Sequence, residues 1–268
     1  MKKRRGITAA DRDRWIAEWE EVRETGYAPF IRTEDLSSEG IKTRVRGVKS
    51  EGRVHHLMSL NEFYAFLQFE FSDFVTNIYE QFPLLPLSRT QAIPLEANIS
   101  HIRYDGTTVD AVVTVDLMVE VLGERLYAFS VKDDNALDDE RTEEKQFLES
   151  AFCELEGIPW RLLEASQLKT VQGRNLELLH GFASPNEVTV LMIEAWLPAF
   201  FASASELPEG TLASAIQRSA NHTGIDYHTA VELFYASVWR KSIYVDLWQH
   251  IRLEQTCRDL GVAPYAGN

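Results

Sequence analysis

Residues 113–132 read VTVDLMVEVLGERLYAFSVK, and this stretch carries the strongest structural signal in the chain. Apolar side chains occupy the odd positions from 113 to 119, while the even positions include Asp116 and Glu120. Alternation with a period of two is typical of a β-strand. A turn at 122–125 and a second short apolar run up to Lys132 therefore predict an antiparallel hairpin.

The register of this hairpin decides which side chains meet across it. If the loop is Gly123–Arg125, Leu122 pairs with Leu126 and Asp116 lies directly opposite Lys132. Their Cβ atoms would then be roughly 5 Å apart. A slip of one residue would move them to opposite faces, so this register is a testable prediction.

Helical signals lie on both sides of the hairpin. Ser59 and Glu62 open an apolar run, and this Ser-x-x-Glu start predicts a buried helix. A charged helix is expected over about 138–156, ended by Gly157, with a strand at 158–163. The order helix, hairpin, helix, strand predicts an α/β domain with helices flanking its sheet.

The segments before and after this domain have a different texture. Residues 11–25 could form a short amphipathic helix, whereas 27–51 read as an extended arm or loops. We therefore divide the chain into an N-terminal arm and helix over 1–50, the α/β domain over 51–168, and a mainly helical domain over 169–268.

The C-terminal domain has the order of elements found in a winged helix. Helices are expected at 212–221 and 227–239, with Asp226 as the N-cap of the second, and 242–245 could be a short strand. A winged helix often reads DNA, but the second helix has no Lys or Arg before Arg240. Contact with a protein is the better interpretation, and the aromatic residues of this helix could equally be core.

Composition and charge limit what the chain can do alone. It has 268 residues, 45% of them hydrophobic, and no run of eighteen apolar residues, so we expect no membrane span and a cytoplasmic location. Its net charge is −14, which argues against tight, autonomous binding to a polyanion. Residues 1–53 are the exception, with 13 basic and 10 acidic side chains.

The hairpin and the preceding helix together offer a constellation suited to phosphodiester hydrolysis. Glu62 and Asp116 supply hard oxygen ligands for Mg²⁺, which keeps several waters and touches the phosphate. Lys132 could orient the attacking water or offset charge developing on phosphorus. The carbonyl of Val131, between Ser130 and Lys132, could complete the coordination.

Each of these residues also has a purely structural interpretation. Glu62 is placed to be the capping-box partner of Ser59, and Asp116 and Lys132 could form an ordinary cross-strand ion pair. The adjacent His55 and His56 point in different directions, which favours placement on the surface. The acidic residues 138–140 are most simply the first turn of a helix.

Five blocks in order across about residues 50–165 resemble the TnsA family. The blocks are Gly52-Arg53-Val54-His55-His56-Leu57, the helix with Glu62, Glu80-Gln81-Phe82-Pro83-Leu84-Leu85-Pro86, Val131-Lys132 to Asp139-Glu140-Arg141-Thr142-Glu143-Glu144-Lys145, and Ile158-Pro159-Trp160. TnsA proteins are endonuclease subunits of heteromeric cut-and-paste transposases. The resemblance implies a restriction-endonuclease-like catalytic domain over 51–168, with a mixed sheet flanked by helices, and a mainly helical, winged-helix-like domain over 169–268.

The resemblance also implies roles for individual residues. The catalytic glutamate of the family falls on Glu62, its metal-binding aspartate on Asp116 and its catalytic lysine on Lys132. Two positions before the lysine the family pattern has an acidic residue or a glutamine, but this chain has Ser130. A serine is a weaker ligand, so this position is expected to contribute through its backbone or a water.

The partners implied by the family are transposon-end DNA, the transposase TnsB and the AAA+ regulator TnsC. The chain would cut the 5′ ends of the element with Mg²⁺ (or Mn²⁺), while TnsB cuts and joins the 3′ ends. TnsC would contact residues 169–268. Two other hypotheses remain: a standalone restriction-like nuclease, and a non-cleaving adaptor that recruits a regulator.

Overall fold

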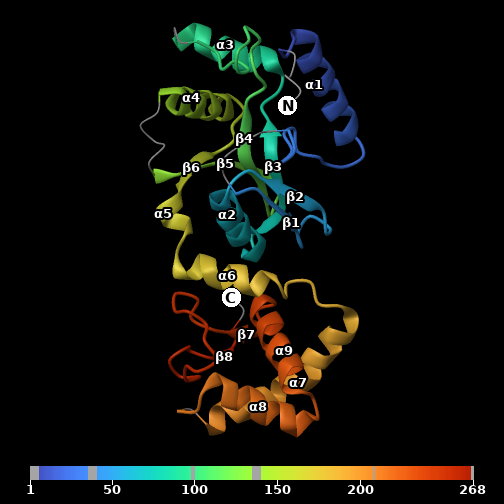
Figure 1. The fold of residues 1–268 in the computed structure, drawn as a ribbon, viewed down its shortest axis with the longest axis vertical. Helices are drawn as coiled ribbons and strands as arrows, with labels where there is room; N and C mark the ends of the chain where they lie inside the picture. The colour runs from blue at the N-terminus through green and yellow to red at the C-terminus, as the bar shows by residue number, and fades with distance from the viewer. Residues whose placement is uncertain (1–5, 36–40, 98–99, 135–139, 208, 267–268) are drawn as a thin grey trace. The chain divides into compact units, whose positions relative to one another are not determined.

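The computed structural model describes residues 6–35, 41–97, 100–134, 140–207 and 209–266. The chain divides after Leu168 into two compact units, and each is described by itself. The acidic residues 138 and 139, expected in the first turn of a helix, lie outside the described residues. Figure 1 shows the course of the chain through both units.

The centre of the first unit is a four-stranded sheet in the order β3-β4-β5-β6. Its strands are β3 (Val75–Pro83), β4 (Thr114–Val121), β5 (Arg125–Lys132) and β6 (Trp160–Glu164). The first three pair antiparallel, while β6 runs parallel to β5. The predicted mixed sheet is therefore present.

The β4–β5 hairpin forms as predicted, but the predicted register is wrong by two residues. Val121 pairs with Arg125, so the connection is 122–124, with left-handed backbone at Gly123 (φ 85°) and Glu124 (φ 59°). Continuing this register places Asp116 opposite Ser130 and diagonal to Lys132. Because a shift of two keeps the parity, Asp116 and Lys132 still share a face.

Helices cover both faces of this sheet (Figure 1). α2 (Leu60–Phe71) packs on one face, where Phe69 and Phe129 lie with ring centroids 4.6 Å apart. α3 (Leu87–Ala97) and α4 (Glu140–Leu155) cover the other face. The core there is formed by apolar side chains of the sheet, both helices and the segments that lead into them: Leu84, Ile93, Val113, Val115, Met118, Ala128, Leu148, Phe152 and Cys153.

The helices expected on either side of the hairpin are confirmed. Ser59 is the N-cap of α2, and its hydroxyl accepts a hydrogen bond from the Glu62 amide. α4 is followed by Gly157, whose left-handed φ of 69° lets the chain leave the helix and enter β6. A short helix, α5 (Ala165–Leu168), ends the unit.

The interpretation of 27–51 as arm and loops missed a strand. β1 (Thr43–Arg46) pairs antiparallel with β2 (Val54–Leu57) in a separate two-stranded ribbon. Its sequence, TRVR, is mostly polar, which is compatible with a strand whose side chains are only partly buried, and it therefore lacks the apolar alternation that would have revealed a strand. α1 (Ala9–Arg23) confirms the N-terminal helix and places the buried Trp19 against Tyr27 and Phe82.

Two further elements of the first unit were also missed. β3 does not alternate cleanly, because Glu80 and Gln81 are adjacent, polar and both buried. α3 contains Pro94, a residue that normally argues against a helix interior.

The described part of the second unit is mainly helical. Its helices are α6 (Val171–His180), α7 (Glu187–Glu206), α8 (Leu212–Thr223) and α9 (Tyr227–Trp239). Asp226 caps α9, as predicted. β7 (Ile243–Tyr244) follows and pairs with β8 (Ala263–Pro264). Phe234, Val238 and Trp239 of α9 are buried, which favours the interpretation of these residues as core.

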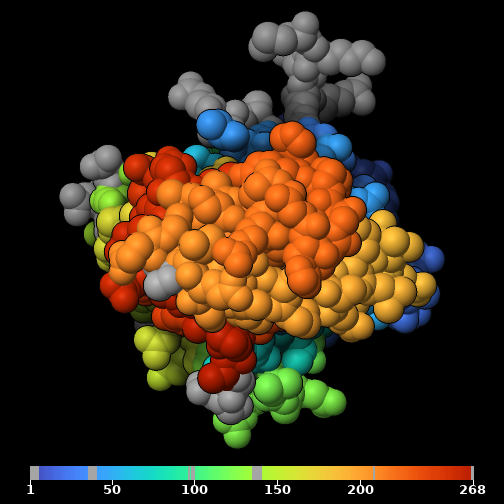
Figure 2. Space-filling view, turned by 90° about the horizontal axis from the view of Figure 1, so that it is seen from below, coloured from blue at the N-terminus to red at the C-terminus, as the bar shows by residue number. Residues whose placement is uncertain are grey.

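α7 is the one described helix that is long and apolar enough to cross a membrane, by length and composition alone. It contains Glu194, and its Trp196 and Phe200 are fully buried. Phe200 packs against Phe234 of α9, and Trp196 donates to Ser219 of α8. α7 and α8 therefore pack side by side, and they form one continuous surface in Figure 2.

Candidate active site

Glu62 is held at the start of α2 by the groups that begin that helix. Its carboxylate accepts hydrogen bonds from the Met58 amide at 2.9 Å and from the Ser59 hydroxyl at 3.1 Å. The capping interpretation is therefore confirmed in substance, although the bonded amide belongs to the residue before the N-cap. The side chain is nonetheless buried, and one of its oxygens also faces the sheet, as described below.

Asp116 lies on β4 where the hairpin strands diverge. Its carboxylate accepts a hydrogen bond from the Val131 amide at 2.7 Å, and the Lys132 Nζ lies 3.4 Å away. The cross-strand ion pair is present, across the diagonal. Val131 thus contributes through its N–H, while the predicted role of its carbonyl as a metal ligand stays a prediction.

A fourth side chain joins the two carboxylates. The amide nitrogen of Gln81 lies 3.4 Å from Glu62 Oε2 and 3.5 Å from Asp116 Oδ1. Glu62 and Asp116 are therefore neighbours, and Lys132 stands beside them. The structure brings together all three residues that the sequence singled out as catalytic.

The two carboxylates have opposite tendencies to ionise. Burial, together with the negative charge of Asp116, raises the pKa of Glu62 to about 8. Burial also opposes the charge of Asp116, but the ammonium groups of Lys132 and Lys145 and the Val131 amide hold its pKa below the ordinary value. Perturbed carboxyl groups in opposite states are typical of functional sites.

Sequence reasoning missed two charged residues of α4 that lie at this site. Lys145 Nζ is 3.9 Å from Asp116 Oδ1 and 3.1 Å from Glu149 Oε1. Glu149 and Asp116 together outweigh burial and keep the pKa of Lys145 above its ordinary value. The spacing of Lys145 and Glu149, four residues apart on a predicted helix, was the available signal.

The hydrogen bonds of the Ser130 side chain go to Glu149 and Trp160 rather than to Glu62 or Asp116. The hydroxyl is fully buried, donates to Glu149 and accepts a hydrogen bond from the Trp160 indole at 3.2 Å. Ser130 therefore links β5 to α4 and β6, and supports Lys145 indirectly through Glu149.

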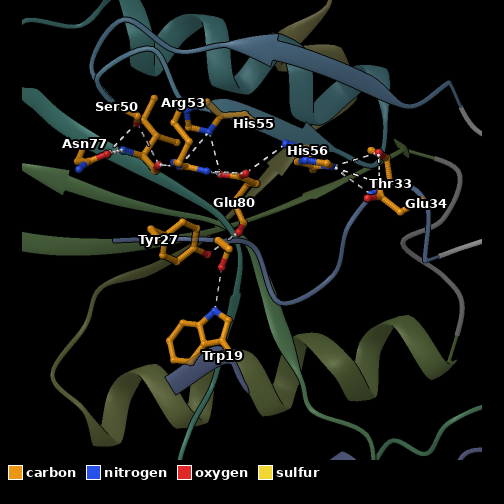
Figure 3. A network of polar contacts seen from close by, with 12 residues as sticks. Trp19, Tyr27, Thr33, Glu34, Ser50, Arg53, His55, His56, Asn77 and Glu80 are labelled. Carbon is orange, nitrogen blue, oxygen red and sulfur yellow. Dashed lines mark hydrogen bonds and ion pairs between the residues drawn. The ribbon is translucent and has the colours of Figure 1, made fainter. Parts of the chain in front are cut away.

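The surface placement predicted for the histidines of β2 was wrong for His55, whereas His56 is partly exposed. His55 is fully buried and its Nδ1 lies 2.8 Å from Glu80 Oε2. The backbone amide of His56 donates to the other Glu80 oxygen at 3.1 Å. Arg53 adds 2.8 Å contacts to both oxygens, and Figure 3 shows all three residues converging on Glu80. A buried carboxylate on β3 accounts for the burial of these polar side chains.

The residues of the site could bind a small, hard cation that keeps several of its waters, but they do not form a site in which protein groups supply all the ligands. Among the residues that the structure describes, no group of three or more His, Cys, Asp and Glu side chains could hold a metal. Glu62 and Asp116 provide two adjacent carboxylates, and Mg²⁺ is commonly held by one or two carboxylates plus water. The two acidic groups therefore suffice for such a site.

Comparison with known proteins adds a family to this geometry. Residues 72–165, which include Asp116 and Lys132, match a family model described as TnsA-like endonuclease N terminal. Transposon Tn7 transposition protein TnsA of Escherichia coli is 36% identical over 156 residues, which are 58% of this chain and 56% of that protein. The match thus spans about half the length of this relative. On this evidence, the first unit is similar to the TnsA-like endonuclease N-terminal domain over residues 72–165.

Proposed function

We propose that this chain is the DNA-cleaving subunit of a Tn7-like transposition complex and a divalent-metal-dependent endonuclease. The observation that carries the proposal is the meeting of Glu62, Asp116 and Lys132, with Asp116 and Lys132 inside the family match. The mixed sheet with helices on both faces is compatible with a restriction-endonuclease-like fold.

Glu62 and Asp116 would hold Mg²⁺, with Mn²⁺ as a substitute, and the Val131 carbonyl could join them. The bound cation would polarise a phosphoryl oxygen and lower the pKa of the attacking water. Glu62 must give up its proton to become a ligand, because its pKa of about 8 leaves it protonated near neutral pH. Asp116 is already ionised and is fixed by the Val131 amide.

The lysines supply positive charge on the other side of Asp116. Lys132 would orient the attacking water or offset the charge that develops on the phosphate. Both lysine side chains are partly exposed, but the Lys145 ammonium is also tied to Glu149, so Lys132 is the one that we expect to reach a bound DNA strand. Lys145 would keep Asp116 ionised rather than touch the substrate.

The wider role that we propose is cleavage of the 5′ ends of the transposon, while TnsB cuts and joins the 3′ ends. The net charge of −14 supports delivery of the DNA by a partner rather than tight binding by this chain alone. Residues 169–268, as a winged-helix-like domain, would contact TnsC. The chain would act in the bacterial cytoplasm, on the nucleoid when assembled on DNA.

The adaptor hypothesis depended on Ser130 marking a decayed site. In this structure Ser130 bonds to Glu149 and Trp160, whereas Glu62, Asp116 and Lys132 remain adjacent. This arrangement favours cleavage. Gene order distinguishes the standalone nuclease hypothesis from the transposition role. Genes for a transposase and an AAA+ ATPase directly downstream would support the transposition role.

The deciding experiment is strand cleavage by the reconstituted complex on labelled transposon-end DNA with Mg²⁺. We expect Asp116→Ala and Lys132→Ala each to reduce 5′ cutting by about 10³-fold or more, while 3′ cutting persists. Asp105→Ala, which removes an exposed aspartate paired with Arg141, is the matched control and should cut normally. Loss of both cuts in a folded Asp116→Ala protein would support the adaptor instead.

A further inference from the structure

Two of the sequence blocks that resemble the TnsA family, 52–57 and 80–86, have no role in the chemistry described so far. The structure joins them at Glu80, where Arg53, His55 and the His56 amide converge (Figure 3). Gln81, the next residue of β3, faces the two carboxylates of the candidate active site. The question is what this adjacency does for the site.

The backbone at Gln81 is in an unusual conformation. Its φ of 48° is left-handed, a region that residues other than glycine rarely adopt and that stores strain. The surrounding contacts hold it there: the Tyr27 hydroxyl donates to the Glu80 carbonyl at 2.6 Å, and the Phe30 amide donates to the Gln81 carbonyl at 3.2 Å. The four donor contacts at the Glu80 carboxylate fix the residue before it.

This conformation aims the Gln81 side chain at Asp116. Gln81 lies opposite Asp116 in the β3–β4 register, between the pairs Glu80–Leu117 and Phe82–Val115. The Thr114 hydroxyl donates to the Gln81 amide oxygen at 3.1 Å. Because the amide oxygen is occupied by Thr114, the NH₂ group faces Glu62 and Asp116.

The NH₂ group has a specific effect on two buried carboxyl groups. Placed side by side with little water, Glu62 and Asp116 repel each other when both are charged. A donor shared between one oxygen of each offsets part of that repulsion and sets their separation. A side chain that merely fills space would not need a strained backbone or a threonine to orient it.

We infer that Gln81 is a positioning residue that holds Glu62 and Asp116 at the spacing that a divalent cation requires. The Glu80 cluster, which consists of Glu80, Arg53, His55 and the His56 amide, holds the backbone next to Gln81 in place. This inference rests on the proposed function, because it assumes that the two carboxylates bind a cation. Partners that orient ligands in this way commonly change metal affinity by about 10- to 100-fold when they are mutated.

The test is Mn²⁺ binding to the full-length chain, measured by calorimetry and by the electron paramagnetic resonance of free Mn²⁺. Gln81→Gly removes the amide at a position where glycine adopts the left-handed backbone without strain. We expect it to stay folded, with a Kd for Mn²⁺ about 10- to 100-fold higher than that of the wild type. Should it not fold, Gln81→Asn, whose amide is one methylene shorter, replaces it.

Gln81→Glu tests whether the NH₂ group of Gln81 faces the two carboxylates, because it replaces that donor by a negatively charged oxygen. It keeps the shape of the side chain but places a third carboxylate among the first two, so we expect a lower Tm without metal and a larger rise in Tm on adding Mn²⁺ than in the wild type. Asp116→Ala should remove Mn²⁺ binding and is the site control.

The outcomes separate the inference from the proposed function. A folded Gln81→Gly protein with wild-type Mn²⁺ affinity would overturn the role of Gln81 while leaving the metal site intact. A Gln81→Glu protein with an unchanged response to Mn²⁺ would also overturn it. Absence of Mn²⁺ binding in the wild type would overturn both the metal site and the inference.

Discussion

Two buried carboxylate clusters meet β3 at adjacent residues, one at Glu80 and the other at Gln81, and the carboxyl groups in them ionise differently. Glu80 is fully buried but accepts contacts from Arg53, His55 and the His56 amide. Burial opposes its charge, yet the hydrogen bond from His55 and the charge of Arg53 hold its pKa below the ordinary value. Its negative charge is therefore compensated within the protein.

In the neighbouring cluster, which Gln81 contacts, Asp116 is compensated by Lys132, Lys145 and the Val131 amide, but Glu62 is not. Glu62 and Asp116 lie beside each other, and the pKa of Glu62 is raised to about 8 because of burial and the charge of Asp116. Breaking a satisfied buried ion pair is costly, whereas carboxyl groups with raised pKa values are typical of functional sites. The contrast supports a structural role for Glu80 and the functional role that we propose for Glu62 and Asp116.

The two clusters should differ most in how much stability is lost when a glutamate is replaced by the isosteric glutamine. Glu80→Gln removes the charge that pairs with the partly buried Arg53 at a fully buried position, so it should lower the free energy of unfolding by about 3–5 kcal/mol. Glu62→Gln should change it little near pH 7, because a carboxyl group with a pKa of about 8 is already mostly uncharged there. Urea unfolding of the metal-free proteins measures both values. Equal losses in the two variants would remove the distinction between the clusters.

A second prediction concerns the pH dependence of stability. The pKa of Glu62 is higher in the folded chain than in the unfolded chain, so the folded state holds the extra proton and loses stability as the pH rises through about 8. The pKa values of His55 and His56 are lowered, mainly by burial, which gives the opposite slope below about pH 6.5. Between about pH 7 and 8 the slope therefore reports Glu62, because the thiols of Cys153 and Cys257, whose pKa values burial raises, add a loss of the same sign only as the pH approaches 9.

The measurement is the Tm of the metal-free protein across that window, compared with Glu62→Gln. The charged groups that act on Glu62 are Asp116 and Lys132. The wild type should lose stability with rising pH and the variant should not. Parallel curves for the two proteins would show that Glu62 ionises normally.

The hairpin and the order of helices could be predicted because local signals specify them. Period-two alternation set β4, Ser59 and Gly157 marked helix ends, and Asp226 capped α9. The exact register could not be predicted, since it depends on left-handed backbone at two turn residues, of which only Gly123 is a glycine. Because the register differs by two residues, Asp116 and Lys132 still lie on the same face of the sheet and form an ion pair.

The polar interior of the first unit could not be predicted from local pattern. β3 was missed and His55 was placed on the surface, because each of these polar side chains is buried only through partners distant in sequence. Arg53 and Glu80 are 27 residues apart. Glu149 was missed at the site for the same reason, since its partner Ser130 belongs to another element.

A smaller effect is expected from steric pressure on the Glu80 cluster. A Cβ added at Gly47 would lie 2.5 Å from His55 Nε2 and 3.0 Å from Glu70 Oε1. Gly47→Ala should therefore cost about 1–3 kcal/mol in urea unfolding by displacing His55. Gly26→Ala is the control, because a Cβ there meets nothing within 4 Å. A neutral Gly47→Ala would mean that the cluster has room to move.

The smallest effect should come from the cap that links α2 to the active site. Ser59→Ala removes the hydroxyl that accepts from the Glu62 amide and donates to the Glu62 carboxylate, so it should cost about 1 kcal/mol. Thr170→Ala removes the equivalent cap of α6 and should cost a similar amount. Only Ser59→Ala should also move the pH dependence of stability to higher pH, because Glu62 loses a donor that favours its charged form. If the two variants gave the same pH profile, the Ser59 hydroxyl would be a helix cap alone, and the electrostatics of Glu62 would be set by Asp116 and burial.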